Sequence, residues 1–199
     1  MPRPRIQHTP LTTQPRAVAA PTAPRRLVAI KPKSQYPNQR VGIFVDVQNL
    51  YHSAKNLYHG RVNYAELLRH LTADRQLIRA LAYVVKSDTA VGEASFFDAL
   101  EKAGLELRLK DLQVYADGMK KADWDVGMAI DAVRMSSFLD VVILVTGDGD
   151  FVPLINYLKW GMGRLVEVAA FRHSTSSKLQ EAADHFVNIE ELPRVIMRR

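Results

Sequence analysis

Cysteine is absent from the 199-residue chain. Disulfide bonds, thiolate metal sites and cysteine nucleophiles are therefore excluded, and the absence fits a reducing compartment. The chain also has no apolar run of the roughly 18 to 20 residues that a membrane helix needs, and no uninterrupted apolar segment of the signal-peptide kind near its N-terminus. These features together predict a cytoplasmic protein with no membrane partner.

Acidic residues are missing from the first 40 positions, which contain eight Lys or Arg residues and eight of the ten prolines. Such a segment cannot bury enough apolar surface to offset the entropy lost on ordering, so residues 1–40 are predicted to form a disordered basic tail. The tail could contact nucleic-acid phosphates or could keep the protein soluble, and its composition does not decide between these roles. Its prolines argue against the amphipathic helix of an organelle transit peptide.

The rest of the chain has a different charge balance. Only eight of the 27 Lys and Arg residues lie in the tail, whereas all 21 Asp and Glu residues follow it. The overall charge of +6 is therefore a property of the tail, and it does not indicate a basic folded domain. With 47% hydrophobic residues, the chain can form one well-buried domain, predicted at 41–192, before a short basic tail at 193–199.

Short apolar runs alternate with amphipathic segments after residue 40. Strands are predicted at 41–46, 77–85, 105–109, 141–145, 165–171 and 186–189, and helices at 63–71, 93–103, 125–138, 151–160 and 174–184. Alternating strands and helices predict an α/β fold, with a parallel sheet between two layers of helices in a three-layer, Rossmann-like arrangement. The helix at 125–138 is expected to bury Val126, Ala129, Ile130 and Val133.

The most informative segment is 140–154. Val141–Val145 predict a strand buried on both faces, which runs directly into Thr-Gly-Asp-Gly-Asp at 146–150. The glycines permit φ > 0 and add no side-chain bulk, so a sharp turn should leave Asp148 and Asp150 close together. An ordinary surface turn needs one aspartate and one glycine, not two of each. Because ligands bind at the carboxyl ends of strands in open parallel sheets, this segment predicts a binding site.

Two other places supply acidic or amide side chains. The first strand ends at Asp46, and Asn49 follows three residues later. Asp125 stands in the first turn of the helix before the central strand, where the helix dipole favours a negative charge. Asp131 lies about 240° further around an ideal helix, so only one of these two carboxylates can face the site. Asp125 is the better candidate, and Asp131 is expected to be structural.

Right-handed crossovers can bring such strand ends together although they lie far apart in the sequence. Several carboxylates in one crevice repel each other unless a cation relieves the repulsion, and hard oxygen ligands suit Mg²⁺ or Mn²⁺ rather than zinc. The sequence has no P-loop, no Gly-x-Gly-x-x-Gly fingerprint and no Ser-centred nucleophile elbow. A metal acting on phosphate esters is therefore the only catalytic device that the residues indicate.

The same residues resemble the motifs of NYN domains, the LabA-like branch of the PIN-like nucleases. The resemblance covers roughly residues 41–192. Its motifs are Val-Asp46-Val-Gln-Asn49, Lys121-x-x-x-Asp125-Val-x-Met-Ala-x-Asp131, Thr146-Gly-Asp148-Gly-Asp150-Phe, and Ser177-x-Leu179 followed by Ala183-Asp184-x-Phe186. It implies a PIN-like α/β fold and a divalent-metal-dependent ribonuclease acting on RNA, with single strands preferred.

The resemblance also implies which residues form the site. Its catalytic set would be Asp46, Asn49, Asp125, Asp148 and Asp150, and the four aspartates of this set would bind the metal. Candidate substrate-binding residues are Thr146 and Lys121 from the motifs and Arg172, which follows the fifth predicted strand and could bind phosphate.

Three questions stay open at this stage. A HAD-type phosphatase is a weaker alternative, since it needs a second aspartate two residues after Asp46, where Gln48 stands. A non-catalytic RNA-binding or regulatory NYN module would keep the fold without the reaction. The oligomeric state is also undecided, with a homodimer as one option.

Overall fold

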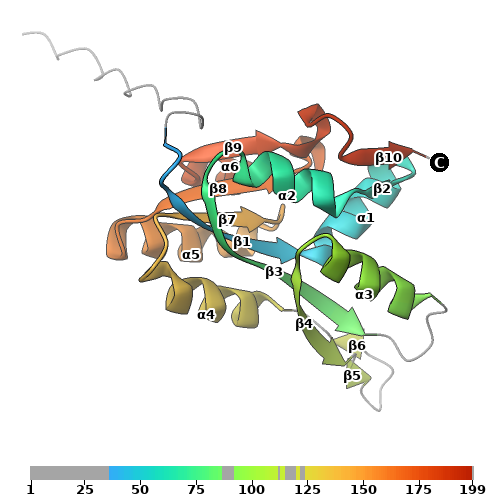
Figure 1. The fold of residues 1–199 in the computed structure, drawn as a ribbon. Helices are drawn as coiled ribbons and strands as arrows, with labels where there is room; N and C mark the ends of the chain where they lie inside the picture. Colours follow the sequence, from blue (N-terminus) through green and yellow to red (C-terminus); the bar gives the residue numbers. More distant parts are fainter. Residues whose placement is uncertain (1–35, 87–91, 112, 115–119, 122–123, 199) are drawn as a thin grey trace, which may run out of the picture. The chain divides into compact units, whose positions relative to one another are not determined.

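A six-stranded, all-parallel sheet forms the centre of the fold (Figure 1). The computed structural model describes residues 36–86, 92–111, 113–114, 120–121 and 124–198. Most of the predicted basic tail, residues 1–35, lies outside these ranges. The strands of the sheet are β1 (Arg40–Asp46), β3 (Gln76–Lys86), β4 (Glu106–Asp111), β7 (Val141–Val145), β8 (Leu165–Ala170) and β9 (His185–Asn188).

The order of the strands determines where the site lies. From one edge to the other the order is β4-β3-β1-β7-β8-β9, so the chain builds outward from β1 in one direction and then returns to build outward from β7 in the other. β1 and β7 are parallel neighbours, with Val45 opposite Val145. The residues that follow, Asp46 and Thr146, therefore meet at the carboxyl edge, at the topological switch point where ligands bind in such sheets.

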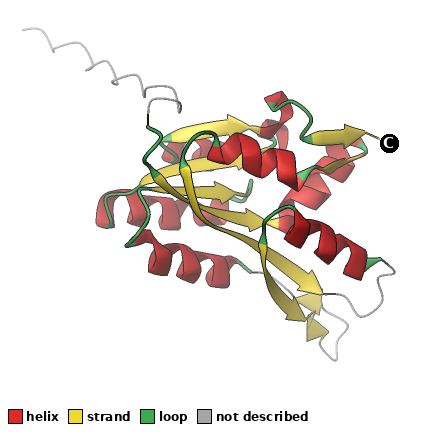
Figure 2. Cartoon of the chain, in the orientation of Figure 1, coloured by secondary structure: helices red, strands yellow, loops and turns green. Residues whose placement is uncertain are grey.

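Helices cover both faces of the sheet, as Figure 2 shows. On one face α1 (Val47–Tyr58), α2 (Tyr64–Thr72) and α3 (Glu93–Lys102) share a core with alternate strand residues such as Ile43 and Val45. On the other face the helices are α4 (Asp125–Ser136), α5 (Val152–Asn156) and α6 (Ser177–Ala182), which pack on the remaining strand residues, Phe44 and Leu144 among them. The predicted three-layer α/β fold is thereby confirmed.

Smaller elements complete the described chain. β2 (Gly60–Val62) pairs in antiparallel fashion with β10 (Ile196–Arg198), and β5 (Gln113–Val114) pairs with β6 (Lys120–Lys121). The segment 193–199, predicted as a basic tail, thus includes a strand that packs on the domain. The remaining short helical segments are η2 (Gly149–Phe151), η3 (Tyr157–Gly161), η4 (Arg172–Ser174) and η5 (Ile189–Glu191). Within the described ranges, no helix is long and apolar enough to cross a membrane.

The first helix, α1, does not appear among the predicted elements. It begins immediately after β1 because Asp46 is both the last strand residue and the N-cap, with its carboxylate accepting a hydrogen bond from the backbone N–H of Asn49. Its buried positions are Val47, Leu50, Ser53 and Ala54, a narrow stripe on a mostly polar helix. A stripe of this kind gives a weak periodic signal in the sequence.

The prediction of the buried face of α4 was right for Ala129 and Val133, which pack against the core, and wrong for Val126 and Ile130. The helix buries Met128, Ala132 and Met135, whereas Val126 and Ile130 are 69% and 52% exposed. Apolar residues occur on more than one side of this helix, so its periodicity did not fix which side faces the sheet.

Candidate active site at the ends of β1 and β7

Thr146 joins the two strand ends that carry aspartates. Its hydroxyl donates a hydrogen bond to Oδ2 of Asp46 at 3.2 Å and accepts one from the backbone N–H of Asp148, also at 3.2 Å. The side chain of Thr146 is fully buried, so water does not compete for these bonds. The sequence-predicted pairing of Asp46 with the Asp148 segment is therefore present, although the two residues are about 100 positions apart.

Asn49 forms a second link across the same junction. Its side-chain oxygen accepts a hydrogen bond from the backbone N–H of Gly147 at 3.0 Å. This bond ties the first turn of α1 to the loop after β7. The side chains of Asp46 and Asn49 thus both bind the loop after β7. Asp46 contacts the side chain of Thr146, and Asn49 contacts the backbone of Gly147.

The two glycines of the loop are needed for close packing. Neither has a positive φ, in contrast to the sharp turn expected from the sequence. A Cβ atom on Gly147 would lie 2.9 Å from the backbone oxygen of Ser174, and one on Gly149 would lie 2.9 Å from the hydroxyl of Ser176. The loop therefore packs directly against the segment after β8, which leaves no room for a side chain.

Asp148 and Asp150 have different environments. Asp148 is the N-cap of η2, and its carboxylate accepts a hydrogen bond from the backbone N–H of Asp150 at 2.9 Å. Asp150 itself is exposed in the first turn of that short helix. The local hydrogen bond orients Asp148 at the end of β7, while the side chain of Asp150 faces solvent.

Burial determines the electrostatics of Asp46. Removal from water raises the pKa of this carboxyl group above its ordinary value, and the nearby charge of Asp148 raises it further. Hydrogen bonds from Asn49 and Thr146 oppose the shift without cancelling it. The negative form of Asp46 is therefore under-compensated, and a proton or a bound cation would stabilise it.

Asp125 begins α4 and lies in its first turn, as predicted. Asp131, expected to be structural, accepts hydrogen bonds from the hydroxyl of Tyr83 at 3.1 Å and from Arg108 at 3.4 Å. No group of three or more Asp, Glu or His side chains in the described part of the chain is arranged to hold a metal ion. The structure thus couples Asp46 with Asp148, and it does not gather all four predicted aspartates into one cluster.

The three predicted substrate-binding residues fall in different places. Thr146 lies at the centre of the site and positions both aspartates. The guanidinium of Arg172 stacks over the ring of Phe186, 5.6 Å from its centroid, so it leans toward the β9 edge of the sheet. The backbone of Lys121 belongs to β6, and the side chain lies outside what the structure describes.

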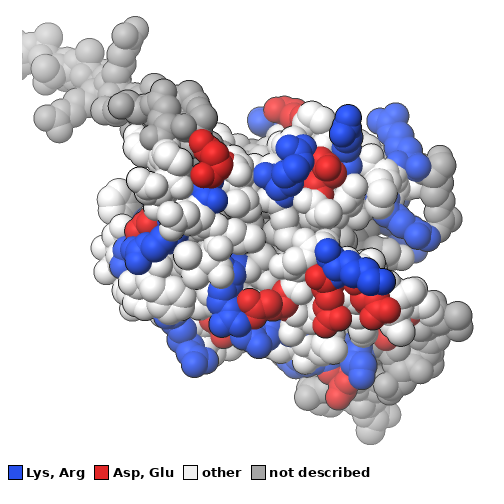
Figure 3. All heavy atoms as spheres, viewed as in Figure 1, with Lys and Arg blue, Asp and Glu red and all other residues white. Residues whose placement is uncertain are grey.

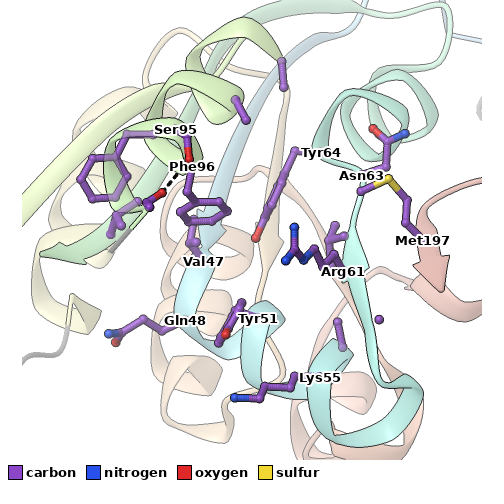
Figure 4. Close-up of a pocket in the computed structure, with 18 of the residues that line it drawn as sticks. Val47, Gln48, Tyr51, Lys55, Arg61, Asn63, Tyr64, Ser95, Phe96 and Met197 are labelled. Atoms are coloured by element: carbon purple, nitrogen blue, oxygen red, sulfur yellow. Dashed lines mark hydrogen bonds between the residues drawn. The ribbon is translucent and has the colours of Figure 1, made fainter. Parts of the chain in front are cut away.

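A groove beside the site was not predicted. It has a volume of about 1270 Å³ and lies between α1, the start of α2 and α3, with Val47 and Gln48, the two residues after Asp46, in its wall (Figure 4). We call it the α1–α3 groove. Tyr51 and Lys55 also line it, and their spacing of four residues on a helix was the signal in the sequence that could have revealed a shared exposed face.

An α/β domain with paired aspartates at a topological switch point belongs to a class that binds its ligands at the carboxyl edge of the sheet. A family model described as the NYN domain matches residues 40–190. The chain therefore belongs to the NYN domain family.

Two relatives extend over most of the chain. The Low amplitude and bright protein LabA of Synechococcus elongatus is 24% identical over 162 residues, which cover 77% of this chain and 85% of that protein. A crystal structure of a protein of unknown function from Vibrio parahaemolyticus is similar with a TM-score of 0.75 and 30% identity, covering 84% of this chain and all of that one. The chain is thus LabA-like in sequence, and its fold is found in a solved structure.

Proposed function

We propose that the protein is a divalent-metal-dependent ribonuclease that hydrolyses RNA phosphodiester bonds between the ends of β1 and β7. The observation that carries the proposal is the buried, under-compensated carboxylate of Asp46, linked through Thr146 to Asp148 at the switch point. Membership of the NYN family, whose fold is of the PIN-like nuclease type, supports it. The domain that carries the activity would span 41–192.

The donor atoms at this junction suit a hard cation. One oxygen of Asp46 accepts a hydrogen bond from the backbone N–H of Asn49 and the other accepts one from the hydroxyl of Thr146, and a carboxylate has about four lone-pair sites in all. Asp148 adds a second carboxylate, and oxygen ligands of this kind fit Mg²⁺ or Mn²⁺. Asp46 and Asp148 would hold the ion, with Asp125 and Asp150 as further proposed ligands at the rim. When bound, the ion would supply an activated water and stabilise the leaving oxygen.

The chain's own residues would hold the substrate in place. In the orientation that lets its oxygen accept from Gly147, the amide of Asn49 keeps its N–H₂ group available to donate to a phosphate oxygen. Thr146 would keep both aspartates at a constant separation. Arg172 and Lys121 are further proposed phosphate contacts.

Cleavage of a labelled, unstructured single-stranded RNA in Mn²⁺ tests the proposal. Wild-type protein should cleave, whereas Asp148→Asn and Asp46→Asn should lose at least about 100-fold in rate, because each removes a charged ligand of the ion. Asp74→Asn is the matched control: Asp74 is exposed in the turn before β3, at the opposite edge of the sheet. Cleavage that persists in Asp148→Asn would come from another site or a contaminant, and it would contradict the proposal.

A specific observation favours a second candidate, a non-catalytic RNA-binding or regulatory NYN module. Only two carboxylates are joined by the hydrogen-bond network at the switch point, and no third His, Asp or Glu completes a metal-binding group in the described ranges. This candidate predicts RNA binding without cleavage in either Mg²⁺ or Mn²⁺. The two functions are therefore separated by measuring binding and cleavage on the same RNA.

A further inference from the structure

We infer that the α1–α3 groove binds the unpaired nucleotides of single-stranded RNA next to the aspartates. The inference deepens the proposed function, and it rests on that function in taking RNA as the ligand. Four properties of the groove support it: its position, its aromatic surfaces, its unpaired cations and the hydroxyl of Tyr64.

The groove begins where the site ends. Val47 and Gln48 follow Asp46 directly and belong to the groove wall, and Tyr64 on the opposite wall is close enough to Asp46 to experience its charge. With a volume of about 1270 Å³, the groove exceeds the roughly 300 to 1,000 Å³ of ordinary small-molecule sites. A strand whose phosphate lies at Asp46 could therefore continue into it.

Aromatic rings from three helices face this space (Figure 4). Tyr51 of α1 is 46% exposed. The ammonium group of Lys55 lies over its ring, 5.7 Å from the ring centroid. Tyr64 of α2 and Phe96 of α3 stand edge to face, with centroids 6.2 Å apart. Aromatic rings bind unpaired bases by stacking, whatever the base, and they cannot stack in this way on bases that remain inside a duplex.

The charged side chains of the groove are mostly cations. Figure 3 shows acidic and basic side chains interspersed on the face in view, and many are paired, as Arg79 is with Glu106. In the groove wall, the cations Lys55, Arg61 and Lys102 outnumber the one carboxylate among the described lining residues, that of Glu93, and none of the three cations forms an ion pair with a carboxylate of the described chain. Three cations that lack acidic partners complement the phosphates of a nucleic acid strand.

Tyr64 supplies a polar group that points into the groove. Its side chain is buried and its hydroxyl faces Tyr51 and Arg61 across the space (Figure 4). Among the described residues this hydroxyl has no hydrogen-bond partner. The hydroxyl is open to the groove, so a ligand with hydrogen-bonding atoms, such as a base edge or ribose, can pair with it there.

The occupancy we infer follows from these features. A base stacks on Tyr51, the phosphates on its two sides contact Lys55 and Arg61, and the Tyr64 hydroxyl contacts the base or sugar of the next nucleotide. Because any base has a face to stack on, the groove would select single strands without selecting a sequence.

Binding measured in EDTA tests the groove separately from cleavage. The probe is a 5′-fluorescein 12-nucleotide RNA without secondary structure, followed by fluorescence anisotropy. Tyr51→Ala and Arg61→Ala should each weaken binding about tenfold, the lower part of the range seen when a stacking or phosphate contact is lost. The controls are Tyr157→Ala and Arg134→Ala, comparably or more exposed residues on the opposite helical layer, which should bind within about twofold of wild type.

The remaining outcomes separate the two proposals. If Tyr51→Ala and Arg61→Ala bind as tightly as wild type, or if a blunt RNA duplex competes as well as the single strand, the groove inference is overturned while cleavage by wild type still supports the nuclease. If binding depends on both residues but no metal supports cleavage, the groove inference stands and the nuclease fails. The substituted side chains are exposed, so all variants should fold. Thermal melts check this and exclude misfolding as the cause of weaker binding.

Discussion

Asp46 has three roles at once: it ends β1, it caps α1 and it accepts a hydrogen bond from Thr146. Ending β1 needs no side-chain group, and capping α1 needs only an acceptor atom, which asparagine also has. Only the proposed metal site needs a charge. Asp46 is therefore a position where folding and function make different demands.

This difference leads to a prediction for stability in the absence of metal. The pKa of Asp46 is higher in the folded than in the unfolded protein, so the folded state binds the extra proton. Wild-type stability should accordingly fall as the pH rises above the unfolded value of about 4 and through the folded pKa. The free energy of unfolding of Asp46→Asn lacks this fall, so the variant should be more stable than wild type at pH 8. The difference in the free energy of unfolding between the two proteins should close toward pH 4.

Urea denaturation in EDTA at several pH values measures the gap, with Asp74→Asn as the control. A gap that stayed constant from pH 4 to pH 8 would mean that the charge of Asp46 is already compensated in the fold. Added Mn²⁺ should raise the stability of wild type and not that of Asp46→Asn, since only a folded carboxylate pair binds the ion.

Arg75 is a residue whose charge serves structure alone. It is buried immediately before β3, at the amino end of that strand. Its guanidinium forms a bidentate ion pair with Glu167, at 2.9 and 3.2 Å, and also donates a hydrogen bond to the backbone oxygen of Leu71. The pair connects the end of α2 with β8.

Removing one member of this pair should leave a buried charge. We expect Arg75→Met to lower the free energy of unfolding by about 3 to 5 kcal/mol, and Arg75→Met combined with Glu167→Leu to recover most of the loss. Urea denaturation of the two variants measures this. If the double variant is no more stable than the single one, the cost comes from the lost backbone bond and not from the unpaired carboxylate.

At the scale of elements, the α4 helix shows what periodicity can and cannot determine. Its position and its start at Asp125 were predictable because helix-forming residues follow an acidic first turn. Its orientation was not, because Val126 and Ile130 suggested one apolar face and Met128 and Met135 another. Packing against β1 and β7 selects the second face.

A matched pair of substitutions tests this orientation. Met128→Ala should lower the free energy of unfolding by about 2 to 4 kcal/mol, because it opens a cavity in the core, whereas Ile130→Ala should change it by less than about 1 kcal/mol. Thermal or urea denaturation gives both values. Equal losses at the two positions would mean that the outer face of α4 is also buried, as it would be in an oligomer.

The sequence was informative wherever a local pattern determined the structure. Buried runs such as Val141–Val145 predicted the parallel strands, and the motifs around Asp46 and Asp148 predicted that these two residues meet. The α1 helix was hidden by its narrow apolar stripe. The α1–α3 groove could not be predicted, because Tyr51 and Phe96 come together only through the packing of helices far apart in the sequence.

At the scale of the whole molecule, the folded body and the basic N-terminal tail differ in charge. All acidic residues lie after position 40, and the α1–α3 groove of the body presents Lys55, Arg61 and Lys102. The groove is local, whereas the tail carries a dense charge without an acidic residue. The two could therefore contribute differently to RNA binding.

Neutralising the tail separates the contributions. Replacing its five arginines before Tyr36 with glutamine should leave the melting temperature unchanged and should reduce the salt dependence of RNA binding, by up to about 0.7 in slope per arginine that contacts a phosphate. Anisotropy titrations at several salt concentrations measure the slope. An unchanged slope would assign the tail to solubility alone. The substituted residues are Arg3, Arg5, Arg16, Arg25 and Arg26.

The pairing of β2 with β10 has a consequence for how the protein is made. β10 is the last described element to leave the ribosome, yet its Met197 lines the α1–α3 groove beside β2, whose residues were translated far earlier. The strands that bear Asp46 and Asp148 are already complete by then, so a nascent chain can assemble its aspartate pair before its nucleotide groove. During that interval β2 has an open hydrogen-bonding edge, and the late arrival of β10 closes it.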